Sequence, residues 1–136
     1  MALFSAEFNS LEELFVEQLE DLYDAEKRLT EALPKMADAA TAKELKQAFQ
    51  NHLRETQQQV TRLETIFRQL GKEPEGKTCE AMKGLVSEGD EMIKAKGDPS
   101  VKDAALIAAA QRVEHYEMAS YGTARTGPAS TPERSG

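Results

Sequence analysis

Carboxylates and one imidazole interrupt the apolar stripes of three predicted helices. In the first, steps of three and four residues lead from Leu22 to Glu26 and on to Leu29, so that a carboxylate lies on the face that should be buried. The other two stripes are interrupted in the same way, each near its middle. The residues concerned are Glu26 in the first helix, His52 and Glu55 in the second, and Glu114 and Glu117 in the third.

Several carboxylates facing one apolar interior carry a large electrostatic cost, because each anion loses its hydration and repels the others. A divalent cation removes that cost. Oxygen-rich sites with one or two imidazoles suit Fe, Mn or, less often, Zn, and helical bundles commonly hold such ions as dinuclear centres. The five residues together therefore predict a metal site, with Fe as a di-iron centre the first choice and Mn or Zn as alternatives.

Each residue alone also has an ordinary structural explanation. A lone glutamate on a stripe is often half-exposed or paired with a cation, and a lone histidine is often a hydrogen-bonded core residue. Only the coincidence of three helices favours the metal. We expect His115 to be exposed, and Tyr23 and Tyr116 to flank the site, where they could hydrogen-bond its carboxylates.

Other polar residues near these stripes have simpler interpretations. Glu20, Asp21 and Asp24 are predicted to form a solvated acidic face. Cys79 is predicted to be a small buried residue rather than a redox sensor, because the chain has no second cysteine to resolve an oxidised thiol.

Four helical segments must position the site. Apolar spacing and breakers place them at about 10–39, 41–70, 78–95 and 99–125, with no competing strand pattern. Pro34 predicts a kink or an earlier end of the first helix, Thr41 with Glu44 predicts a capping box, and Gly71 predicts the end of the second helix. The fold class is therefore all-α, an antiparallel bundle of three long helices and one short helix.

The size and the net charge of the chain limit the functions that it can have. A chain of 136 residues is one domain, which we place at residues 1–125, with a flexible polar tail over 126–136. A net charge of −7 disfavours nucleic acid and membrane surfaces as partners. Without a membrane span or a signal-like N-terminus, the protein is expected in the cytoplasm.

Four stretches in order resemble the YciE/YciF family of ferritin-like, or rubrerythrin-like, bacterial stress proteins. They are LEDLYDAEKRLTEALPKMA, HLRETQQQVTRLE, CEAMKGLVSEG and DAALIAAAQRVEHYEMASYGTA. The resemblance covers residues 8–125 and implies a four-helix bundle with a dinuclear metal centre, a tendency to dimerise and a role under stress. It also implies ligand roles for Glu26, for Glu55 with His52, and for Glu114 and Glu117.

The sequence departs from the family pattern in two places. The usual Glu-x-x-His of the second helix is reversed as His52-x-x-Glu55, which leaves open whether His52, Gln59 or neither reaches the metal. After the SYGTA motif, a further long helix is expected in the family, but here Gly127-Pro128 and a polar stretch follow. An apolar groove would then stay open, which predicts a homodimer or a higher homo-oligomer in which a partner's helix could fill the groove.

Two functions follow from these observations. The first is a carboxylate-bridged di-iron protein with a ferroxidase or peroxide-handling role under stress. The alternative is a non-catalytic helical oligomerisation or interaction module that has lost the full metal site. Whether the protein is an enzyme stays open at this stage.

Overall fold

The computed structural model describes residues 7–125, which form four helices and no strand. These are α1 (Leu11–Ala39), α2 (Lys43–Gln69), α3 (Glu80–Lys94) and α4 (Pro99–Ala124). The all-α fold and the four predicted segments are confirmed. The predicted tail over 126–136 lies outside the described residues, as do the first six residues of the predicted domain.

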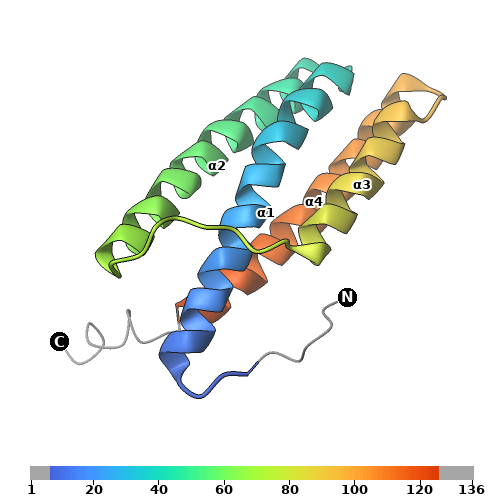
Figure 1. Cartoon of the computed structure of the whole chain (residues 1–136). Helices are drawn as coiled ribbons and strands as arrows, with labels where there is room; N and C mark the ends of the chain where they lie inside the picture. The colour runs from blue at the N-terminus through green and yellow to red at the C-terminus, as the bar shows by residue number, and fades with distance from the viewer. Residues whose placement is uncertain (1–6, 126–136) are drawn as a thin grey trace.

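The helix α1 is the centre of the bundle. It packs against α2 on one side and against the α3–α4 hairpin on the other (Figure 1). The helices α2 and α4 have almost no direct packing against each other. The two arms therefore diverge on one side of α1 and leave a groove there.

Helix ends follow the local sequence in most places. The Ser10 hydroxyl accepts a hydrogen bond from the Glu13 amide and caps α1, and Asp98 caps α4 ahead of Pro99. Gly71 adopts a positive φ of 74° after α2. The amide of Lys72 then bonds the Phe67 carbonyl, which is the Schellman arrangement that Gly71 predicts.

The helix α1 continues through Pro34 to Ala39, so the predicted range of 10–39 is confirmed and the earlier end is not found. One local prediction is corrected. The capping box at Thr41 is wrong, because α2 begins after Ala42 without any side-chain cap. The Asp103 carboxylate of α4 satisfies the helix start instead, since it accepts hydrogen bonds from the amides of Thr41 and Ala42, each at 2.8 Å.

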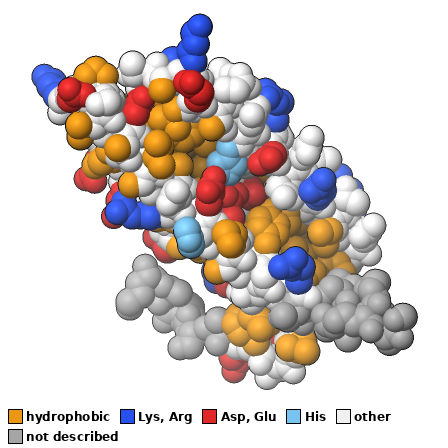
Figure 2. All heavy atoms as spheres, turned by 180° about the vertical axis from the view of Figure 1, so that it is seen from behind, with side chains coloured by type: hydrophobic (Ala, Val, Ile, Leu, Met, Phe, Trp, Pro, Cys, Tyr) orange, Lys and Arg blue, Asp and Glu red, His pale blue; other side chains and the backbone are white. Residues whose placement is uncertain are grey.

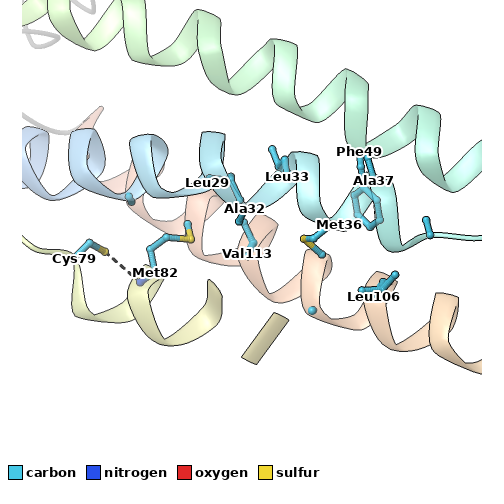
Figure 3. Close-up of a cluster of buried hydrophobic side chains, with 13 residues drawn as sticks. Leu29, Ala32, Leu33, Met36, Ala37, Phe49, Cys79, Met82, Leu106 and Val113 are labelled. Atoms are coloured by element: carbon cyan, nitrogen blue, oxygen red, sulfur yellow. Dashed lines mark hydrogen bonds between the residues drawn. The ribbon is translucent and has the colours of Figure 1, made fainter. Parts of the chain in front are cut away.

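The buried apolar side chains form two clusters rather than one. The larger cluster joins one half of α1 to α2, α3 and α4, with Leu29, Leu33 and Phe49 among its members (Figure 3). The smaller cluster joins the other half of α1 to the end of α2. The buried polar residues Glu26 and Thr56 lie at the level between them. No helix within the described range has an apolar stretch long enough to cross a bilayer.

Candidate metal centre

Glu26 is the most unusual residue of the core. It lies on α1 between Leu22 of the smaller cluster and Leu29 of the larger one, and it is 0% exposed. The apolar residues one turn away on either side fix its direction, because they draw this face of α1 into the core. The prediction that a carboxylate interrupts the buried stripe of α1 is therefore confirmed.

The two oxygens of the Glu26 carboxyl group differ in their hydrogen bonding. Oε2 accepts a hydrogen bond from the Tyr121 hydroxyl at 3.0 Å. Oε1 is buried and no donor group among the described residues reaches it. Burial, and then the hydrogen bond with the neighbouring Glu117 carboxylate and its negative charge, raise the pKa of Glu26 to about 9. At neutral pH this carboxyl group therefore holds a proton.

Glu117 of α4 lies between Glu26 and His52. Its Oε1 is 3.2 Å from His52 Nε2, and both side chains are 15% exposed. The hydrogen bond to Glu117 raises the pKa of His52 against the effect of burial. Burial alone would raise the pKa of Glu117, but His52 and Glu26 together lower it. Charge is thus separated across the cluster: Glu26 is neutral and Glu117 is anionic.

Glu55 and Glu114 lie at the surface, on α2 and α4 respectively. Both line the groove between these helices, together with His52 and Glu117. Both also raise the pKa of His52 by their charge, so they lie within its electrostatic reach. The structure therefore places four of the five predicted residues, His52, Glu55, Glu114 and Glu117, on one groove. Glu26 does not line the groove but lies in the core behind it, next to Glu117.

The groove has a volume of about 1020 Å³. In Figure 2 acidic and histidine side chains lie at the centre of this face, with hydrophobic side chains on either side of them. Gln59 lines the groove and is half-buried, but it makes no hydrogen bond with the Glu26, His52 or Glu117 side chains. Of the two alternatives, His52 is the one in contact with the carboxylate cluster.

As placed, the described residues contain no group of three or more His, Cys, Asp or Glu side chains that could hold a metal ion. The donor types nevertheless suit a hard divalent cation, since four of the five are carboxylates. The unpartnered Oε1 of Glu26 is a further observation of the same kind, because a buried oxygen without a donor is the position where a cation would gain most. Glu55 and Glu114, being exposed, have room to change rotamer.

The tyrosines near the site are not the ones predicted. Tyr23 donates to Glu64 at 2.8 Å, and Tyr116 donates to Asp21, so neither reaches the cluster. Tyr121 supplies the hydrogen bond to Glu26 instead. The sequence holds a signal for it, because Tyr121 is four residues after Glu117 and therefore shares its face of α4.

The predicted acidic face of α1 is also corrected. Asp24 accepts hydrogen bonds from the Cys79 amide at 2.7 Å and from Arg28, and Asp21 contacts the Cys79 thiol as well as Tyr116. These carboxylates attach the start of α3 to α1. Cys79 is fully buried, as predicted, and burial raises the pKa of its thiol. His115 is exposed, also as predicted.

Comparisons with known proteins place this arrangement in a family. Residues 10–129 match the family described as "Domain of unknown function (DUF892)". The chain is 46% identical to the protein YciF of Escherichia coli (strain K12) over 118 residues, which cover 86% of this chain and 71% of YciF.

Two solved structures have the same fold. YcfI from Rhodopseudomonas palustris superposes with a TM-score of 0.85 at 45% identity, covering 91% of this chain and 79% of YcfI. The E. coli stress protein YciF superposes with a TM-score of 0.83 at 45% identity, covering 88% of this chain and 76% of YciF. The resemblance seen in the sequence is thereby confirmed, and the chain belongs to the DUF892 family, which it shares with the stress protein YciF.

Proposed function

We propose that this member of the family is a cytoplasmic metal-binding protein that holds divalent iron, as a two-metal centre, at the level of Glu26. The observation that carries the proposal is the fully buried Glu26 carboxyl group with one unpartnered oxygen, placed beside an anionic Glu117. A buried carboxyl group without a donor costs free energy. A bound cation that replaces the proton on Glu26 would offset this cost, which explains why the buried carboxyl group is present.

The residues that would hold the metal are Glu26, His52, Glu55, Glu114 and Glu117. Four carboxylates and one imidazole balance two divalent charges without leaving a large excess of either sign. The same donors could also bind Mn or Zn, which are the alternatives to iron. Metal binding would have to displace the proton on Glu26, so affinity should rise with pH.

When bound, iron supplies redox chemistry with O₂ or peroxide, which is the basis of a ferroxidase or peroxide-handling role under stress. The chain itself contributes orientation and access. Tyr121 fixes one oxygen of Glu26, and His52 fixes one oxygen of Glu117. The groove admits a small oxidant from solvent, while the two apolar clusters exclude water above and below the polar level.

Anaerobic loading with Fe(II), followed by desalting and elemental analysis, tests the proposal. We expect the wild type to retain iron and the double variant Glu26→Ala/Glu117→Ala to lose it. A matched control is Glu12→Ala/Glu44→Ala, which removes two exposed carboxylates outside the groove. Retention below about 0.2 metal per chain in the wild type, unchanged in the double variant, would contradict metal binding. Iron should also raise the melting temperature of the wild type alone.

A second candidate function is a non-catalytic helical module that self-associates. The exposed large apolar side chains of α4 favour it, since Val101 is 66%, Ile107 43% and Met118 70% exposed. Association as a homodimer or higher homo-oligomer is then expected to be insensitive to chelator and added metal. Sedimentation of the protein with and without Fe(II) separates the two functions. A metal-dependent rise in stability would count against the purely structural module.

A further inference from the structure

A second hollow lies on a different side of α1 from the groove. It has a volume of about 310 Å³ and is lined by α1, α3 and α4, without any residue of α2. It shares no lining residue with the groove that His52 and Glu117 line. Nothing in the proposed metal function uses it. Its size falls within the range of about 300–1,000 Å³ that is common for small-molecule sites.

The interior of this α1–α3 pocket is apolar. Leu29 and Met36 of α1, Ile93 of α3, and Ala109 and Val113 of α4 are among its lining residues. Most of these side chains are buried and belong to the larger core cluster, so the pocket reaches down to the core itself.

Gly89 keeps one wall of the pocket open. A Cβ atom added there would meet only the Cβ of Ala109, at 3.9 Å, which is ordinary contact. A methyl group is therefore tolerated at this position, and a longer side chain would add bulk at the wall of the pocket. This makes position 89 a means of filling the pocket by substitution.

The rim of the pocket carries an excess of positive charge. Lys35 and Lys83 line it, and within residues 7–125 neither forms an ion pair. The rim residue Arg28 is paired with Asp24 at 2.7 Å, and the rim residue Asp90 with Lys94 at 2.9 Å.

Counted together, the lining has three cations, Arg28, Lys35 and Lys83, against two acids, Glu31 and Asp90, and Asp90 also lies within the electrostatic reach of Lys35. Such a local excess of cations contrasts with a chain whose net charge is −7. An anionic group at the rim would therefore be attracted at close range.

We propose that the α1–α3 pocket binds a short, single-chain amphipathic carboxylate. Its alkyl chain would lie on Leu29, Met36 and Val113, and its carboxylate would lie at the rim near Lys35 and Lys83. At about 30 Å³ for each small group, the pocket accommodates about ten non-hydrogen atoms. Octanoate, with eight carbons and two oxygens, has that size.

Titration of the full chain with sodium octanoate, followed by methyl NMR shifts of Met36 and Ile93, tests the proposal. We expect saturable binding with a Kd below about 1 mM, given the number of atoms buried. Octanol lacks the charge and butyrate lacks the chain length, so both should bind about tenfold more weakly or worse. No saturation by octanoate up to about 10 mM would overturn the proposal, and so would equal binding of octanol.

Two variants probe the two halves of the site independently. Gly89→Leu fills the apolar part and should abolish binding, whereas Gly89→Ala, which adds only the tolerated Cβ, should retain it. Lys35→Glu/Lys83→Glu should weaken octanoate about tenfold. The control Lys43→Glu/Lys96→Glu makes the same charge change outside the pocket and should leave binding unchanged. If Gly89→Leu fails to fold, the lysine pair still decides: equal weakening by both lysine pairs would contradict a specific site.

Discussion

Two buried carboxyl groups of this bundle have opposite environments. Asp103 receives two backbone amides, one on each oxygen, and these hydrogen bonds lower its pKa. Glu26 receives a single hydroxyl, leaves one oxygen without a partner, and has its pKa raised to about 9. The first group fixes the start of α2, whereas the second interacts with the Glu117 carboxylate in the core and has one oxygen that no donor group reaches.

This difference separates a structural carboxylate from a functional one. A carboxylate whose two oxygens each accept a backbone amide stabilises the fold, and it has fewer lone pairs left for a ligand. A buried carboxyl group with a free oxygen costs stability, so it persists where another role requires it. Incomplete hydrogen bonding is therefore a better guide to the site than burial or acidity alone.

The largest expected contrast is in the pH dependence of stability. The folded pKa of Glu26 is above its unfolded value of 4.5, so the folded state binds a proton that the unfolded state releases. Stability should therefore fall between pH 4.5 and about 9, by on the order of 1 kcal/mol per pH unit. Urea unfolding of the chelator-treated protein from about pH 5.5 to 8.5 should show this slope. Glu26→Gln should reduce it to the smaller fall that the raised pKa of His52 contributes, and equal slopes in both proteins would contradict the interpretation.

The next largest effect is expected from Asp103→Ala. The change leaves the amides of Thr41 and Ala42 without acceptors at the start of α2. A fall of roughly 5–10 °C in melting temperature is expected at neutral pH. Because the folded pKa of Asp103 is lowered, the wild-type advantage should be present above its unfolded pKa of 3.8 and vanish as the pH falls through the folded value. An advantage that grows on acidification would contradict this sign.

A smaller effect is expected from Tyr121→Phe, which removes the hydroxyl that donates to Glu26. The free energy of unfolding should fall by about 1 kcal/mol. The pKa of Glu26 should rise further, because the Tyr121 hydrogen bond lowers it. Carboxyl ¹³C NMR titration measures this directly. Tyr23→Phe removes a comparable hydrogen bond to Glu64 and serves as the control, with no change expected in the pKa of Glu26.

The smallest effect is expected from Thr56→Val. Thr56 is 1% exposed and lies at the polar level, but its hydroxyl donates within α2 to the His52 carbonyl at 2.8 Å. The His52 carbonyl also accepts a backbone hydrogen bond of the helix, so removing the Thr56 hydroxyl leaves no polar atom without a partner. A change within about 1 kcal/mol in chemical unfolding is expected. A larger loss would show that Thr56 supports the carboxylate cluster as well.

Hydrophobic periodicity is sufficient to find the helices and the interrupted stripes. It identifies Glu26 and Glu117 because each replaces an apolar residue at a step of three or four. Such steps define a face within one helix, but they contain no information on which residues of another helix lie opposite. For that reason periodicity places Tyr121 on the same face of α4 as Glu117 but does not show that it contacts Glu26. It also suggests for Tyr116 a role that its contact with Asp21 excludes.

The capping of α2 shows the same limit more sharply. Thr41 and Glu44 match the local pattern of a capping box, yet Asp103, more than sixty residues away, satisfies the amides. A tertiary contact has replaced a local one. The divergence of α2 from α4, which creates the groove, likewise depends on packing that no single segment specifies.

The distances along the chain also constrain the order of folding. The α1–α2 hairpin is closed by a short connection, whereas His52 and Glu117 are 65 residues apart in sequence and Glu26 and Tyr121 are 95 apart. Local contacts form faster than distant ones. The hairpin should therefore assemble first, with the pieces of the carboxylate cluster still separated, and the cluster should form only when α4 docks. The appearance of the native Glu26 carboxyl resonance during refolding would then report when α4 docks, which is the last step of folding.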